Sequence, residues 1–259
     1  MDRPWGLGAD GSTPSQWTAD DLDLDAAARS SRRVTEALSM HLRAAAISSR
    51  RSSYSTMLIE GRGVDAVTVS RLPARHGPGA TLIPSGFRNL LPDQRAHVLL
   101  SALHRNLAPL AADEGWTAEL DACVARIRED GYACEWTSAW KKTRDRTLLV
   151  RIVARIEDDG YGRWIAEIAD SEANVLRRTR ELIGWTWVRN FELMAKEMRF
   201  ASAHVLTVGR GSGFLHTESV IDLDTGSVTE SGDGPVQILN YPGEPGLAVP
   251  EVVVEEFSL

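Results

Sequence analysis

The stretch TLLVRIVARIEDDGYGRWIAEIA, residues 147–169, decides the fold. Apolar side chains alternate with others through both of its halves, and the acidic, glycine-containing segment 158–162 separates the halves. Alternation with a period of two is typical of a strand with one buried face, and a short Asp/Gly segment between two such runs favours a tight turn. We therefore expect an antiparallel hairpin. Its buried face should carry Leu148, Val150, Ile152, Ala154 and Ile156 on one strand and Trp164, Ala166 and Ile168 on the other.

A third strand is expected just before this hairpin. Cys134, Trp136, Ser138 and Trp140 alternate in the same way, so both tryptophans are expected on one face, where large apolar groups pack into a core. The connection that follows is basic and carries Lys141, Lys142, Arg144 and Arg146. A charged run in a turn is usually solvated, and the alternative is that this turn, together with Trp136 and Trp140, contacts an anionic ligand or partner.

Helical periodicity flanks the strands. We expect helices over 32–46, over 91–115 and from Thr117 to a stop at Gly131, and another whose apolar face includes Trp187, Phe191 and Met194. Residues 54–72 predict a second hairpin, and the runs 204–214, 217–224 and 227–231 predict further strands. Hairpins interleaved with amphipathic helices indicate an α+β fold, an antiparallel sheet with helices packed on one face. Segments 49–70 and 143–168 share a plan that suggests a weak internal duplication.

Charge is distributed unevenly along the chain. The 259 residues carry a net charge of −7, of which residues 1–28 and 232–259 contribute −5 each, so that 29–231 is +3. We expect an acidic disordered tail over 1–28, a single α+β domain over 29–231 and a Pro-rich acidic tail over 232–259. The run VVVEEF near the end could still add as a strand to a sheet edge.

The composition restricts the class of protein. Cys123 and Cys134 are the two cysteines, too few for a disulfide framework or a cysteine-based zinc site. The N-terminus lacks the pattern of a secretory signal, and no run is long and apolar enough for a membrane span. The sequence thus predicts a cytoplasmic protein with no cofactor and no membrane partner. Arginine outnumbers lysine 26 to 3, as in proteins from GC-rich bacterial genomes, so arginine content alone does not indicate phosphate binding.

Three sequence patterns resemble functional motifs. Residues 209–213 form a glycine-rich run, but the strand-like residues after it favour a hairpin loop over a phosphate site. Residues 224–226 read Asp-Thr-Gly, and one copy favours a tight turn over an aspartic-protease site. His97 and His104 share a helix face but would need a third ligand to bind a metal. Each pattern therefore predicts local structure rather than catalysis.

Two functions remain open. We expect a non-catalytic cytoplasmic binding or adaptor protein, of the chaperone, immunity or regulator kind, whose partner is another protein. The alternative is an enzyme or sensor for a small anionic molecule, which would use the turn 141–146 with Trp136 and with His216 and Glu218 as an acid–base pair. Nucleic acid is not the expected partner, because the chain is acidic overall and neither of its basic segments, 29–51 and 141–151, carries a nucleic-acid motif.

Overall fold

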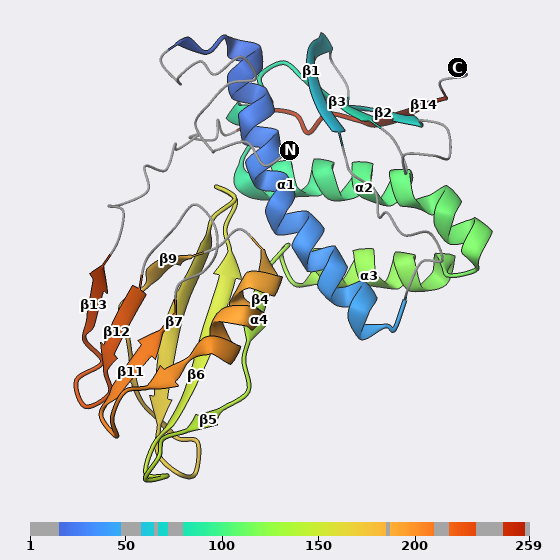
Figure 1. Cartoon of the computed structure of the whole chain (residues 1–259). Helices are drawn as coiled ribbons and strands as arrows, with labels where there is room; N and C mark the ends of the chain where they lie inside the picture. The colour runs from blue at the N-terminus through green and yellow to red at the C-terminus, as the bar shows by residue number, and fades with distance from the viewer. Residues whose placement is uncertain are drawn as a thin grey trace. The chain divides into compact units, whose positions relative to one another are not determined.

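The chain folds into two compact units. The computed structural model describes residues 16–47, 58–64, 67–71, 80–184, 187–209, 218–231 and 246–256, and Figure 1 shows the course of the chain. The first unit comprises Met1–Ala133, Asp158–Gly160 and Leu239–Leu259, and the second comprises Cys134–Glu157 and Tyr161–Ile238. The predicted α+β class is confirmed. Residues of the predicted domain 29–231 occur in both units.

Three helices build the described core of the first unit. They are α1 (Ala19–Ala44), α2 (Pro92–Glu114) and α3 (Thr117–Glu129). The first begins at a capping box in which Thr18 and Asp21 satisfy each other's backbone N–H groups. It therefore starts inside the predicted acidic tail and well before the predicted start at residue 32. Sequence reasoning missed this part because the aspartates of 20–25 hide the helical period. Residues 1–15 and 232–245 lie outside the described residues, so disorder there stays a prediction.

Helix ends follow the sequence signals. Pro92 occupies the first turn of α2, where its missing N–H costs nothing, and Gly115 ends that helix with a left-handed φ of 80°. Gly131 ends α3 as predicted, because its N–H reaches Arg128 and the next N–H, of Tyr132, reaches Ile127. At the start of α3, Trp116 rather than Thr117 holds the N-cap position.

A four-stranded sheet, sheet A, contacts α1 and α2. Its strands are β1 (Leu58–Val64), β3 (Ala80–Pro84), β2 (Val67–Arg71) and β14 (Val252–Glu256), in that order across the sheet. The predicted hairpin over 54–72 is wrong, because β1 pairs with β3 in parallel and β2 pairs with the other side of β3. This pairing differs from that of β6 and β7, so it gives no support to an internal duplication. The predicted addition of the C-terminal run to a sheet edge is confirmed by β14.

Sheet B forms one layer of the second unit. It contains β4 (Glu135–Thr137), β5 (Lys141–Lys142), β6 (Leu149–Ile156), β7 (Gly162–Ala169), β8 (Val175–Arg178) and β9 (Leu182–Gly184). The central pair β6 and β7 is the predicted hairpin, with Ala154 opposite Trp164 and Ile152 opposite Ala166. These four side chains are buried, so the predicted face is the core face. Leu148 is half-buried and precedes the strand, which begins at Leu149.

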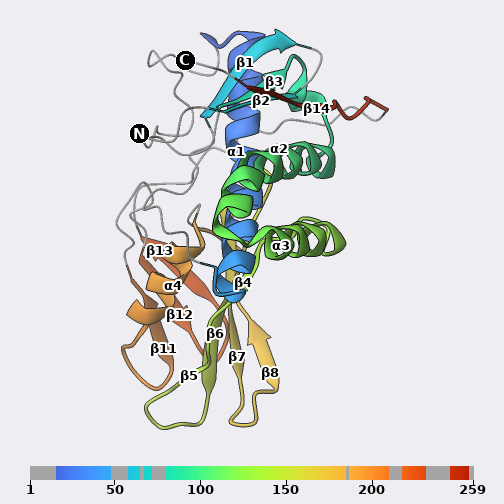
Figure 2. The same cartoon turned by 90° about the vertical axis from the view of Figure 1, so that its right-hand side faces the viewer.

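Sheet C and one helix form the other layer. Sheet C contains β10 (Arg199–Phe200), β11 (Val205–Val208), β12 (Glu218–Asp222) and β13 (Val228–Ser231), and the helix is α4 (Val188–Glu197). Both lie on the core face of sheet B (Figure 2). Phe191 of α4 stacks on Trp136, and Arg177 of β8 donates to the carbonyl of Leu223. The apolar face predicted for α4 is confirmed by buried Val188, Phe191 and Met194, whereas Trp187 at its N-cap is exposed.

Candidate functional site

Trp136 lies half-buried on the core face of sheet B, as its position in the alternation indicates. It lies on β4 opposite Ala154, and its ring stacks on Phe191 with the centroids 6.5 Å apart and the planes inclined by 22°. Offset stacking of this kind stabilises a core beyond the area it buries. Trp136 is therefore engaged in packing, and the structure does not bring it to the basic turn as a ligand contact.

Trp140 lies on the opposite face of sheet B, so the prediction that both tryptophans share one face is wrong. Trp136 pairs with Ala154 on β6, but Lys141 pairs with Val150, which leaves one extra residue in the connection from β4 to β5. One extra residue is a β-bulge, and it reverses the alternation of side chains beyond it. Trp140 consequently contacts Arg151, whose guanidinium carbon lies 4.3 Å from the ring centroid. Such a cation–π contact is an electrostatic attraction between the guanidinium and the face of the ring.

The basic turn divides into one structural lysine and three exposed cations. Lys141 faces α4, and its Nζ donates to the carbonyl oxygens of Met198 at 2.6 Å and Lys196 at 3.4 Å. A cation at the C-terminal end of a helix is favourable because the last carbonyls there lack partners within the helix. Lys141 is thus a cap for α4. Lys142, Arg144 and Arg146 are exposed, as the solvated-turn interpretation requires.

Asp145 and Thr143 hold this turn in one conformation. Asp145 accepts hydrogen bonds from the hydroxyls of Thr143 at 2.7 Å and Thr147 at 2.9 Å, and these bonds lower the pKa of its carboxyl group. Thr143 is buried, and its backbone N–H donates to the carbonyl of Leu148 at 3.0 Å. Arg146 adopts a left-handed φ of 62° and donates its N–H to the carbonyl of Thr143. The three cations therefore project from an ordered turn.

A row of charges crosses sheet B beside Trp140. Arg151 on β6 lies opposite Glu167 on β7, which lies opposite Arg178 on β8. Glu167 is buried and accepts from Arg151 Nε at 2.7 Å and from Arg178 Nε at 2.8 Å. Burial raises the pKa of Glu167, but the hydrogen bonds from Arg178 and Arg151 outweigh it, so the pKa lies below its ordinary value. We call this side of the sheet the charged face. Its members include Trp140, Lys142, Arg151, Val153, Arg155, Arg163, Ile165, Glu167 and Arg178.

Replacing Glu167 tests the charge row through the pH dependence of stability. A carboxyl group whose pKa is lowered on folding stabilises the protein above its unfolded pKa, and that contribution disappears as the pH falls through the folded value. The variant Glu167→Gln should therefore be less stable than the wild type at neutral pH. The difference should shrink below pH 4.5, the ordinary glutamate value. Urea unfolding across this range measures it, and a difference that grows on acidification would contradict the assignment.

The alternative acid–base pair is not assembled by the described residues. Glu218 begins β12, where it lies opposite Ser231 of β13, and His216 lies outside the described residues, as does most of the glycine-rich run 209–213. The Asp-Thr-Gly run is the predicted tight turn. The carboxylate of Asp222 accepts the N–H groups of residues 224 and 225, and Gly226 has a φ of 75°.

The histidines of α2 have separate partners. His97 Nδ1 lies 2.9 Å from the hydroxyl of Tyr132, and His104 Nε2 lies 2.7 Å from Asp121. Burial, with a smaller contribution from Arg128, lowers the pKa of His97. Neither histidine acquires the set of ligands that a metal requires, and in the described ranges no three His, Cys, Asp or Glu side chains are grouped to hold a metal ion.

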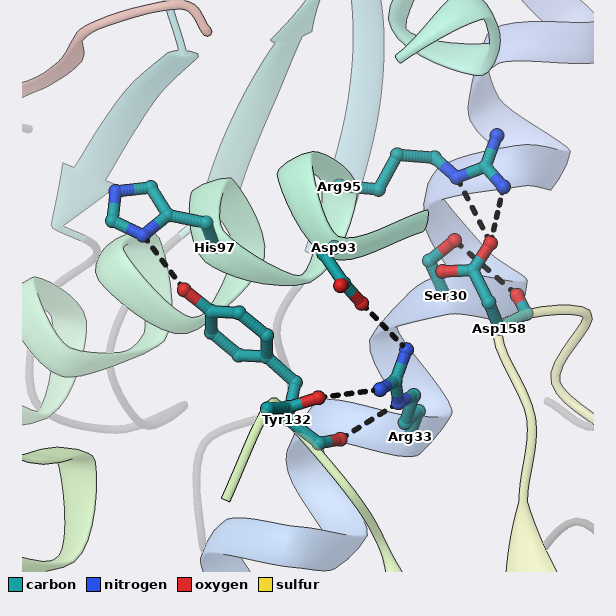
Figure 3. A network of polar contacts seen from close by, with 8 residues as sticks. Ser30, Arg33, Asp93, Arg95, His97, Tyr132 and Asp158 are labelled. Atoms are coloured by element: carbon teal, nitrogen blue, oxygen red, sulfur yellow. Dashed lines mark hydrogen bonds and ion pairs between the residues drawn. The ribbon is translucent and has the colours of Figure 1, made fainter. Parts of the chain in front are cut away.

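A polar network in the first unit was missed by sequence reasoning (Figure 3). Arg33 of α1 donates to the carbonyl oxygens of Gly131 and Tyr132, both at 2.7 Å, and so satisfies the C-terminal end of α3. Arg95 of α2 is buried and pairs with Asp158 through Nε at 3.0 Å and through a second, shorter contact from Nη2. Burial raises the pKa of Asp158, which Arg95 opposes.

The turn that contains Asp158 fits closely against α1. The backbone oxygen of Asp158 accepts from the hydroxyl of Ser30 at 3.3 Å. At Gly160, where φ is 79°, a Cβ atom would lie 3.0 Å from the Cα of Arg29. A glycine is therefore required both by the backbone conformation and by the close approach. These contacts join parts of the first unit, and they hold the turn against α1.

Comparisons with known proteins supply no function for this geometry. No protein-family model, no curated protein and no solved structure matches the chain significantly. Within the described segments, no helix combines the length and the apolar character needed to cross a membrane.

Proposed function

We propose that the chain is a non-catalytic cytoplasmic adaptor that binds an acidic segment of another protein through Lys142, Arg144 and Arg146. One observation carries the proposal: these three exposed cations project from a turn that Asp145 and Thr143 already hold in one conformation. A preordered surface loses less conformational entropy when it binds than a mobile one does. The turn is therefore better suited to a partner than an ordinary solvated loop.

The arrangement of the cations favours a protein partner over a small anion. A small anion is held by donors that converge on it, often at a helix N-terminus or in a concave backbone site. Lys142, Arg144 and Arg146 are instead spaced along an exposed turn with Asp145 among them, which suits carboxylates spaced along a chain. Each exposed ion pair contributes about 0–1 kcal/mol, so the complex should be weak, transient and sensitive to salt.

A charge-neutralising triple variant tests this function. The variant K142Q/R144Q/R146Q should bind a labelled peptide of repeated Glu-Glu-Ser units about tenfold more weakly than the wild type at low salt, because about 1.5 kcal/mol of ion pairing is lost. Fluorescence anisotropy measures the affinity, and the difference should shrink toward physiological salt.

The matched control removes the same charge elsewhere. The variant R105Q/R126Q/R128Q neutralises three exposed arginines of α2 and α3, so it changes the net charge by the same amount. It should retain most of the peptide affinity. Equal losses in the two triple variants would mean that only net charge matters, and the proposal would then fail. Tighter binding of a single-stranded oligonucleotide of equal charge would identify nucleic acid as the partner instead, and inorganic phosphate that displaces the peptide would favour the small-anion alternative.

A further inference from the structure

We propose that the charged face of sheet B continues the binding surface and takes an apolar side chain of the acidic partner, with Trp140 as its anchor. This inference rests on the proposed function, since it concerns the same partner. It adds that the partner's segment is amphipathic, with apolar residues among its carboxylates.

The β-bulge places Trp140 next to the basic turn. Because the bulge reverses the alternation, Trp140 and Lys142 lie on the charged face, while Lys141 between them turns toward α4. Trp140 is half-buried, and the guanidinium of Arg151 packs on its ring. The cation–π contact favours one orientation of the ring, and Trp and Arg are among the residues most enriched where binding energy concentrates.

An apolar row lies beside the charge row. Val153 on β6 pairs with Ile165 on β7, two residues along from the pair formed by Arg151 and Glu167. Both apolar side chains are half-buried, so part of each remains accessible on the charged face. Trp140 and this row together offer apolar area within a basic surround. An apolar side chain that enters this area is removed from water, and its neighbouring carboxylates meet cations.

The charge of the basic turn and of the charge row favours an acidic partner. The basic turn and the adjoining charge row together carry five cationic side chains and two carboxylates, a net charge of +3 on a chain whose total is −7. Those seven residues are Lys142, Arg144, Arg146, Arg151, Arg178, Asp145 and Glu167. Both carboxylates are already satisfied, Asp145 by the threonines of its turn and Glu167 by Arg151 and Arg178. An approaching anion therefore meets the excess of positive charge.

A second copy of the chain is a poorer occupant. A symmetric dimer through this surface would bring its +3 charge against the same charge of the other copy, and like charges across an interface are unfavourable. An acidic segment with apolar residues has the opposite charge and supplies the apolar contact. We therefore assign this surface to such a segment of a different protein.

Two peptides of equal charge separate the two contacts. The full-length protein is titrated with a labelled peptide of repeated Glu-Glu-Leu units and with one of repeated Glu-Glu-Ser units. The leucine peptide should bind the wild type about five- to tenfold more tightly, since a leucine side chain leaves water on binding. In Trp140→Ala this preference should fall below about twofold, with the affinity for the serine peptide changed little.

Controls make each outcome decisive. Trp187→Ala removes an exposed tryptophan at the N-cap of α4, on the other side of sheet B, and should keep the preference. Val153→Thr keeps the shape of a strand residue and should halve the preference, which tests the surface without removing a large side chain. The inference is overturned if the wild type shows no preference, or if Trp140→Ala retains it. It is also overturned if sedimentation shows a dimer that Trp140→Ala abolishes. If neither peptide binds at all, the proposed function fails together with it.

Discussion

Replacing Asp158 with alanine should lower the free energy of unfolding by about 3–5 kcal/mol. Asp158 and Arg95 form a buried ion pair in the first unit, with side-chain exposures of 12% and 4%. Removing the carboxylate leaves the guanidinium of Arg95 buried without its counter-charge, and that desolvation is no longer repaid. Urea unfolding followed by far-ultraviolet circular dichroism measures the loss, since α1, α2 and α3 contribute most of the helical signal.

A double replacement distinguishes this cause from general disruption of the turn. In R95M/D158N neither member of the pair is charged, so the double variant should be more stable than the sum of the losses measured in R95M and in D158N predicts. If the two losses are simply additive, the ion pair is not the origin of the effect. If Asp158→Ala costs less than about 1 kcal/mol, the pair is weak in the manner of a surface salt bridge.

The second large effect is expected in the second unit, where Trp164→Ala should cost about 3–5 kcal/mol. Trp164 is 4% exposed on the core face of sheet B, between Ala154 and Leu182 on the neighbouring strands. Packing around it is tight, because a Cβ atom on Gly184 would lie 2.8 Å from both Trp164 and Phe191. The cavity left by truncation therefore cannot close easily. Denaturant unfolding measures the loss.

Trp187→Ala is the matched control for this substitution. Trp187 is 41% exposed, so the same truncation there should cost about 1 kcal/mol or less. The contrast tests whether burial, rather than the loss of any tryptophan, determines stability. Equal losses at the two positions would contradict the assignment of the core face.

The sequence predicts the helices and strands best where the signal lies in neighbouring residues. In residues 147–169 the alternation, the turn composition and the strand lengths agree, and the register of β6 with β7 follows from them. The face of α4 and the glycine ends of α2 and α3 follow in the same way from periodicity and from the left-handed preference of glycine. Each of these features depends on residues that are neighbours in the chain.

The sequence does not predict features that depend on residues distant from each other in the chain. Alternation marks β1 and β2 as strands, but it does not reveal that β3 lies between them. The turn at Asp158 has an ordinary turn composition, and nothing in it indicates that Arg95, 63 positions earlier, is its partner. Such pairings depend on how the whole core packs, and no local sequence pattern determines them.

The candidate site was predicted in part. The composition of the turn predicts exposed cations. It does not predict that Lys141 caps α4, because that role depends on where α4 lies. The bulge that separates Trp136 from Trp140 had no clear signal, since Ser138, Ala139 and Trp140 also fit continuous alternation. The register of β6 settles which tryptophan faces the core and which lies beside the turn.

The most direct test of the account is to map where an acidic peptide binds. Amide resonances of the nitrogen-15-labelled full-length protein would be followed while a peptide of repeated Glu-Glu-Ser units is added at low salt. The account predicts that the largest shift changes fall on residues 141–147 and that they fade as salt is raised toward physiological strength. Changes centred elsewhere, on the arginines of α2 and α3 for example, would contradict it.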